Sequence, residues 1–178
     1  MPLSKRFTKA LDDRAARPLN ADALAALATT YVARYQTSSG KLTAYLKRKL
    51  RERGWEDADN PQIAAIVARC VERGYIDDQS FAMARAGALA RKGYGPRRVA
   101  AALRAAGIDP GLIDTKDNGD DDEVRRIAHI YARKRRIGPY ARNDASPDQI
   151  RKWIAAMINA GHSYTIASEL ARLPPADN

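Results

Sequence analysis

The chain is 178 residues long and 45% hydrophobic, which suits either one ordinary domain or three small stacked modules. Its 31 Lys and Arg against 21 Asp and Glu leave a net charge of +10, which predicts nucleic acid or an acidic protein as partner, although charge alone also permits an anionic membrane. An apolar run of about 18 residues and an apolar leader are both missing from the sequence. We therefore expect a cytoplasmic protein with no membrane partner.

The first segment, residues 1–22, has few large hydrophobic residues and carries charges of both signs around Pro18. Such a composition buries too little apolar surface to order a chain, so we predict a flexible basic arm. The ordered body is predicted to begin near Ala23. It should be all-α, because strand signals are nearly absent from the sequence.

Residues 23–76 are predicted to form three helices. The first has an apolar stripe from Leu24 to Val32 with spacings of three and four, which is the period of a helix. The boundaries of the other two are predicted from capping residues, because Ser favours the N-cap, Pro the first turn and Gly the position after the end. These residues are Ser38 or Ser39 and Gly54 for the second helix, and Pro61 and Gly74 for the third.

Residues 77–119 repeat this order less completely. Asp77 is predicted to cap the first helix, and Pro96 lies in the predicted first turn of the second. The third helix is weak, since DPGLIDTKDNGDDD supplies only Leu112 and Ile113 as core residues. We expect a short helix and a linker there.

Residues 120–173 form the third predicted repeat, followed by a tail over residues 174–178. Its first helix is predicted from Glu123 to Ile137, and the loop GPYARNDASPDQ separates this helix from one around Trp153. Ser163 is predicted to cap the last helix, which should end before Pro174.

Aromatic and glycine residues recur at a nearly fixed spacing in the three segments and form a ladder of equivalent positions. Tyr31, Phe81 and Tyr131 lie 50 residues apart, and Gly54, Gly107 and Gly161 follow at intervals of 53 and 54. A fixed period of this kind is typical of repeat proteins, in which each unit buries its apolar face against a neighbour. We therefore predict three tandem three-helix repeats that stack into an elongated, curved body.

Basic residues concentrate in the two end segments. Residues 1–76 carry a net charge of +6, residues 77–122 carry −1 and residues 123–178 carry +5. In the first repeat, a helical step of 100° per residue places three cations opposite the leucines of the second helix. This predicted basic face consists of Lys47, Arg48 and Arg51.

Two further basic pairs occupy equivalent positions. Counted back from the terminal glycine, Arg97 and Arg98 match Arg151 and Lys152. Both pairs lie near a helix N-terminus, where the macrodipole disfavours each cation by about 0.3–1 kcal/mol. A phosphate or carboxylate partner would explain them, and a solvated pair kept for solubility is the alternative. With the basic face, these four residues are the predicted partner-binding and DNA-binding residues.

Catalytic and metal-binding patterns are missing from the sequence. His129 and His162 have no second ligand at metal spacing, and we expect surface or partly packed side chains. The acidic run from Asp120 to Glu123 could hold a divalent ion, but it more simply complements the start of a helix. Cys70, the only cysteine, should be buried. We predict no cofactor, no metal and no enzymatic activity.

Residues 74–108, GYIDDQSFAMARAGALARKGYGPRRVAAALRAAGI, resemble the central signature of the RecX family of recombination regulators. The segments LKRKLRERGW and GHSYTIASEL resemble flanking motifs of the same family. The resemblance implies tandem three-helix repeats and a non-catalytic role. A family member would bind the RecA recombinase filament, inhibit its recombinase, ATPase and co-protease activities, and bind single- or double-stranded DNA weakly and without sequence preference.

The predicted mechanism places the elongated basic body along the groove of the RecA–DNA filament, as a monomer. The rival interpretation is a helix-turn-helix transcriptional regulator, in which a short helix reads the major groove. Against it, Arg97 and Arg98 are followed by apolar AAAL rather than by polar side chains that could contact base edges. A nucleic-acid-processing enzyme is the third and weakest alternative.

Overall fold

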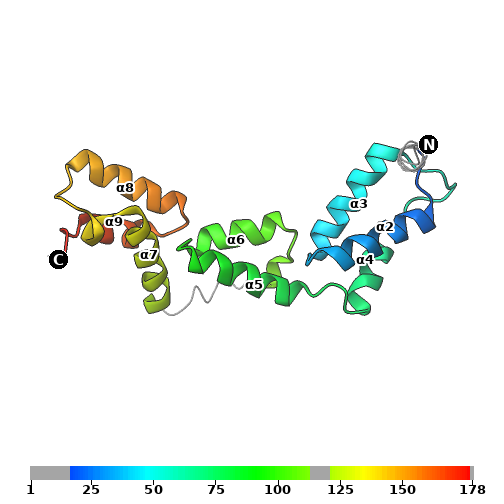
Figure 1. Ribbon diagram of the computed structural model, residues 1–178, viewed down its shortest axis with the longest axis horizontal. Helices are drawn as coiled ribbons and strands as arrows, with labels where there is room; N and C mark the ends of the chain where they lie inside the picture. Colours follow the sequence, from blue (N-terminus) through cyan, green and yellow to red (C-terminus); the bar gives the residue numbers. More distant parts are fainter. Residues whose placement is uncertain (1–16, 113–120, 177–178) are drawn as a thin grey trace, which may run out of the picture. The chain divides into compact units, whose positions relative to one another are not determined.

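The computed structural model describes residues 17–112 and 121–176, and within these ranges it is all-α apart from one isolated bridge. Three tandem repeats of helices follow one another along the chain, as predicted (Figure 1). The first repeat holds α2 (Ala21–Arg34), α3 (Ser39–Arg53) and α4 (Ile63–Glu72). The second holds α5 (Asp78–Arg91), α6 (Pro96–Ala105) and the 3₁₀ turn η1 (Pro110–Leu112), and the third holds α7 (Asp121–Arg135), the 3₁₀ turn η2 (Gly138–Tyr140), α8 (Pro147–Asn159) and α9 (Tyr164–Arg172).

The chain divides into two compact units, residues 1–78 and 79–178. The first unit contains the first repeat, and the second unit contains the second and third repeats. The predicted boundary at residues 76 and 77 therefore falls two residues before the division between the units.

The predicted glycine ladder is present in the backbone. Gly54, Gly107 and Gly161 follow the second helix of each repeat with φ of 81°, 68° and 97°. This left-handed region is costly for other residues, which explains why glycine recurs at these three positions. The matching aromatics lie on the first helix of each repeat, on α2, α5 and α7.

The core of the first repeat forms where α2, α3 and α4 meet. Its buried side chains come from all three helices and from the segments that flank them. Ser38 caps α3 by accepting a hydrogen bond from the Lys41 backbone N–H at 3.2 Å. Of the two serines considered, Ser38 is thus the cap. The buried members of the core are Leu19, Leu24, Ala28, Leu42, Leu46, Ile66, Val67, Cys70 and Ile76.

The flexible arm predicted over residues 1–22 is too long at its C-terminal end. Leu19 is fully buried, and its N–H donates to the Gly54 carbonyl at 3.0 Å while its carbonyl accepts from Glu56. Asn20 then caps α2, which begins at Ala21. The prediction failed because the stabilising partner of Leu19 is a turn more than 30 residues away, which local composition does not reveal.

Two other helix boundaries differ from prediction. Helix α4 begins at Ile63, so Pro61 lies before the helix rather than in its first turn. Helix α7 runs from Asp121 to Arg135, two residues earlier at each end than predicted. In the second repeat, η1 is a single 3₁₀ turn, and the predicted linker at residues 113–119 lies outside the described residues.

Several other predicted helix starts agree with the structure. Helix α5 begins directly after Asp77, and α6 begins at Pro96 with Gly95 as its N-cap. Ser163 caps α9 by accepting from the Ile166 N–H at 3.3 Å. Cys70 is 6% exposed, and burial raises the pKa of its thiol, so the side chain behaves as a small apolar residue.

Candidate partner and nucleic-acid interface

The basic face of α3 is exposed to solvent. Lys47, Arg48 and Arg51 are all exposed, whereas Lys49 and Arg53 on the neighbouring side are half-buried. Glu52 accepts from Arg48 at 2.8 Å and from Lys49 at 2.7 Å. These hydrogen bonds, that of Lys49 first, lower the pKa of the Glu52 carboxyl, which stays ionised and offsets part of the local positive charge.

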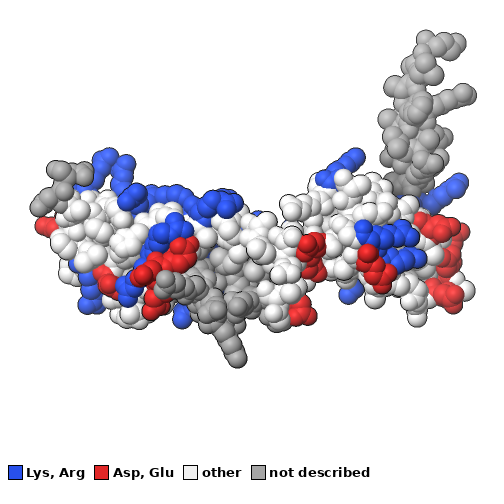
Figure 2. Space-filling view, turned by 90° about the horizontal axis from the view of Figure 1, so that it is seen from below, with Lys and Arg blue, Asp and Glu red and all other residues white. Residues whose placement is uncertain are grey.

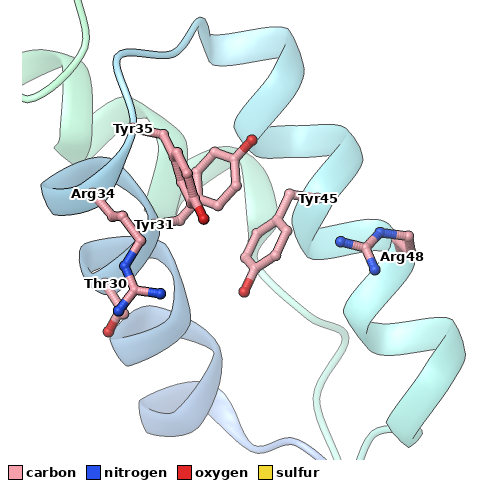
Figure 3. A pocket seen from close by; sticks show the side chains of 6 residues that line it. All are labelled: Thr30, Tyr31, Arg34, Tyr35, Tyr45 and Arg48. Carbon is pink, nitrogen blue, oxygen red and sulfur yellow. The ribbon is translucent and has the colours of Figure 1, made fainter.

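Beside this face, α2 and α3 enclose an open cleft of about 320 Å³, which we call the first-repeat cleft (Figure 3). The rings of Tyr31 and Tyr45 are stacked, with centroids 4.3 Å apart and planes inclined by 22°. The ring centroid of Tyr35 lies 5.2 Å from that of Tyr31, and Tyr35 is 51% exposed. The six lining residues are Thr30, Tyr31, Arg34, Tyr35, Tyr45 and Arg48.

In the second unit, glycines bring the start of α6 against the turn between α8 and α9. The Gly95 N–H donates to the Ala160 carbonyl at 2.9 Å, and the Arg97 N–H donates to the Gly161 carbonyl at 3.2 Å. A Cβ atom on Gly95 would lie 2.5 Å from the Gly161 carbonyl carbon. Only glycine permits this approach, so the signature G-Y-G-P joins the second repeat to the third.

A buried histidine completes this junction and corrects the prediction of a surface or partly packed His162. The ring is fully buried, and Nε2 lies 3.0 Å from the Gly93 carbonyl oxygen. Since a carbonyl only accepts, the neutral ring carries its proton on Nε2, which leaves Nδ1 without a partner among the described residues. Burial lowers the pKa of His162, and the Gly93 hydrogen bond opposes this only in part. His129 is half-buried beside Tyr140, as predicted.

The predicted basic pairs flank the junction. Arg97, Arg98, Arg151 and Lys152 are all exposed. Arg151 pairs with Asp148, and both of these side chains are more than 70% exposed. The Arg98 guanidinium lies 5.9 Å from the centre of the Tyr94 ring. Figure 2 shows Lys and Arg side chains gathered in a band over the second unit, on the left of the view.

Between the second and third repeats lies a second open cleft of about 440 Å³, the junction cleft. Arg98 enters it from α6, and Arg135 enters it from the last turn of α7, 5.9 Å from the Tyr131 ring centre. Neither arginine forms an ion pair within the part of the chain that the structure describes. The cleft is lined by Tyr94, Arg98, Tyr131, Arg135, Ile137, Trp153, Ala156, Asn159 and Ala160.

The structure thus brings predicted and unpredicted residues together. Arg48 joins the tyrosines of the first repeat, and Arg98 joins Arg135, whereas Arg151 and Lys152 lie outside the residues that line the junction cleft. Neither Arg34 nor Arg135 was predicted to bind a partner, and neither cleft was predicted. The sequence did contain a signal for these groupings. Four residues after the ladder tyrosine comes Tyr35 in the first repeat and Arg135 in the third, a spacing that places both side chains on one helix face.

Residues 17–112 and 121–176 contain no helix that is both long enough and apolar enough to cross a membrane. Within the same ranges, three or more His, Cys, Asp or Glu side chains nowhere come together in a group that could hold a metal ion. Asp121, Asp122 and Glu123 lie in the first turn of α7, where they complement the helix dipole.

The chain is similar to known proteins over most of its length. Residues 77–115 match the family domain described as "RecX, second three-helix domain". "Regulatory protein RecX" of Chlorobaculum tepidum is 32% identical over 133 residues, which are 73% of this chain and 77% of that protein. "Regulatory protein RecX" of Myxococcus xanthus is 29% identical over 154 residues, 82% of each chain.

Solved structures share the fold. The crystal structure of RecX from Lactobacillus salivarius superposes with a TM-score of 0.62 at 18% identity, and the match covers 83% of this chain and 91% of that one. A second crystal structure, of "regulatory protein RecX", has a TM-score of 0.62 at 16% identity, covering 97% of this chain and 79% of that one.

The helices and clefts together define the class: a helical-repeat protein with exposed arginines beside aromatic side chains. The sequence relatives narrow this class to one family. The chain belongs to the RecX family, as its central signature indicated.

Proposed function

We propose that this protein is a non-catalytic regulator that binds the RecA recombinase filament and inhibits its recombinase, ATPase and co-protease activities. Nonspecific DNA binding is an accessory property. Membership of the RecX family supports this proposal, because the curated relatives carry the name regulatory protein. A cytoplasmic location follows from such a role.

The observation that carries the proposal is the position of Arg97 and Arg98. Both are exposed in the first turn of α6, where the helix dipole disfavours cations, and neither forms an ion pair among the described residues. The glycine contacts of the junction hold their backbone in place. An arrangement that is unfavourable within the protein and rigidly held is suited to an anionic partner, such as acidic side chains or phosphates.

The test is a titration of the protein into a preformed RecA filament on single-stranded DNA, with and without free RecA. We expect ATP hydrolysis and strand exchange to slow, and we expect Arg97→Glu with Arg98→Glu to weaken the effect. The matched control is Arg142→Glu with Arg172→Glu, which makes the same charge change at two other exposed positions of the second unit. Circular dichroism and melting should be nearly unchanged in both variants.

Two outcomes would contradict the proposal. The first is a protein that neither binds RecA filaments nor slows strand exchange at low salt. The second is tight binding to one duplex operator that random competitor DNA does not reduce, which is the behaviour of a sequence-specific transcriptional regulator.

A further inference from the structure

The first-repeat cleft has three tyrosines, and they are not all buried in the core of that repeat. Tyr31 and Tyr45 pack in part against the buried core, but Tyr35 is 51% exposed at the C-cap of α2. None of the three hydroxyl groups makes a hydrogen bond to another described residue. In Figure 3 the three rings lie between the two helices, and Tyr31 is in ring contact with both Tyr35 and Tyr45.

Arginines lie at both sides of these rings. The Arg48 guanidinium is 5.5 Å from the Tyr45 ring centre and is paired with Glu52. Arg34 comes from α2 and forms no ion pair with any described residue. The cleft therefore offers flat aromatic surface together with an uncompensated cation. Its volume of about 320 Å³ is at the small end for ligand sites, which suits one planar group rather than a long ligand.

This combination favours one class of ligand over two others. A duplex keeps its bases stacked inside the helix and would engage only the arginines. The carboxylates of an acidic peptide would likewise pair with Arg34, but they offer no flat π-face to stack on the tyrosines. An unpaired base has an exposed π-face for a tyrosine and a phosphate within reach of an arginine, which is how many proteins hold single strands without reading sequence.

We propose that the first-repeat cleft binds single-stranded nucleic acid, with one unpaired base stacked on Tyr35 beside the Tyr31–Tyr45 pair and its phosphate on Arg34. The inference rests on the accessory DNA binding in the proposed function and assigns that binding a site, a strand type and a mode of contact. It does not require that the same cleft contacts RecA.

The first experiment measures fluorescence anisotropy of a labelled oligo(dT) of about 16 nucleotides, titrated with the full chain. Tyr35→Ala should weaken binding about fivefold or more, since loss of one stacked base has at least that effect. Tyr35→Phe keeps the ring and should bind nearly as the wild type does. The matched control is Tyr75→Ala, because Tyr75 is 53% exposed in the same unit and lies outside the cleft.

The second experiment separates the phosphate contact from general loss of charge. Arg34→Gln and Arg69→Gln each remove one exposed cation from the first unit. Only Arg34→Gln should reduce the slope of log affinity against log salt, by about 0.7 for a single strand. Cross-linking with an oligonucleotide that contains 5-iododeoxyuridine should then label the tryptic peptide that holds Tyr35.

Three results would overturn the inference while leaving RecA regulation intact. Tyr35→Ala could bind oligo(dT) as tightly as Tyr75→Ala. A duplex of the same length could compete as well as the single strand does and depend equally on Tyr35. Tyr35→Ala could lose binding to DNA-free RecA and retain oligo(dT), which would make the cleft a protein contact. Failure of the proposed function is judged separately, by wild-type protein in the filament titration.

Discussion

The first-repeat cleft and the junction cleft have similar chemistry but are built differently. Each uses a ladder tyrosine, Tyr31 or Tyr131, with other aromatics and two arginines. The first-repeat cleft forms between two helices of one repeat, whereas the junction cleft needs the second and third repeats to pack together. Aromatic–arginine surfaces can therefore arise from either arrangement, and disruption of the junction should remove one cleft and spare the other.

The substitution expected to separate the behaviour of the two clefts most strongly is Gly161→Ala. Gly161 has φ of 97°, and a Cβ there would collide with the backbone nitrogen of Arg98. Left-handed strain costs about 1–2 kcal/mol, and overpacking adds about 1–3 kcal/mol. We expect the unfolding free energy of the second unit to fall by about 3 kcal/mol in urea denaturation.

The matched control for this substitution is Gly54→Ala. Gly54 occupies the equivalent ladder position with φ of 81°, but a Cβ there would meet nothing within 4 Å. The loss should therefore be about 1–2 kcal/mol, from backbone strain alone. Equal losses at the two glycines would show that the junction contacts contribute little. Gly161→Ala should still bind oligo(dT) through the first-repeat cleft.

The next largest effect should come from acidification, which should lower the stability of the junction through protonation of His162. Its pKa is lowered in the folded protein, chiefly by burial, so the unfolded chain binds the proton more readily. Stability of the second unit should therefore be full above the unfolded value near pH 6.5 and fall as the pH drops from there toward the lowered folded pKa. Denaturation of the wild type across this range should show the loss.

His162→Gln is the matching variant, because its amide can still donate to the Gly93 carbonyl but cannot be protonated. We expect a lower but pH-independent stability between pH 5 and 7, apart from changes shared with the wild type. A slope that persists unchanged in His162→Gln would assign the pH dependence to other groups.

Loss of single caps should have a smaller, unit-specific effect. Asn20 accepts from the Ala23 N–H at 2.9 Å in the first unit, and Ser163 accepts from the Ile166 N–H in the second. Each alanine substitution should cost about 1 kcal/mol, because one helix N–H loses its acceptor. Hydrogen exchange should show faster opening in the unit that carries the change, while Thr29→Ala, with an exposed hydroxyl bonded within its own helix, should leave both units unchanged.

The smallest expected effect concerns charge. Glu52 pairs with Arg48 near the first-repeat cleft, whereas the arginines of the junction cleft have no described acidic partner. Glu52→Gln should make the two clefts more alike, so oligo(dT) binding should strengthen modestly and its salt dependence should steepen. Glu72→Gln, an exposed acid in the same unit, is the control. Equal gains in both variants would indicate a general charge effect.

Local signals were sufficient for much of the fold. The positive φ at Gly54, Gly107 and Gly161, the serine caps and the Pro96 start all follow from preferences that act within a few residues. The signature at residues 74–108 was equally informative, because two of its glycines, Gly93 and Gly95, lie against the third repeat. A backbone position that only glycine can occupy can therefore be recognised in the sequence.

Long-range contacts explain what was missed. Leu19 is ordered by the turn at Gly54, and His162 is buried against Gly93, 69 residues away in sequence. The clefts also depend on packing between helices, so exposed basic residues could be predicted individually but not their grouping with tyrosines. The predicted face of Lys47, Arg48 and Arg51 is exposed, and its role in binding stays a prediction.

The distribution of the two tryptophans has a spectroscopic consequence. Trp55 lies in the first unit, where its indole N–H donates to the Asp59 carbonyl, and Trp153 lies in the second unit at the junction cleft. Each unit therefore has its own intrinsic fluorophore. Trp153→Phe leaves tryptophan emission from the first unit alone, and Trp55→Phe leaves it from the second. These two variants allow the same titration to be followed separately at each end of the chain without an added dye.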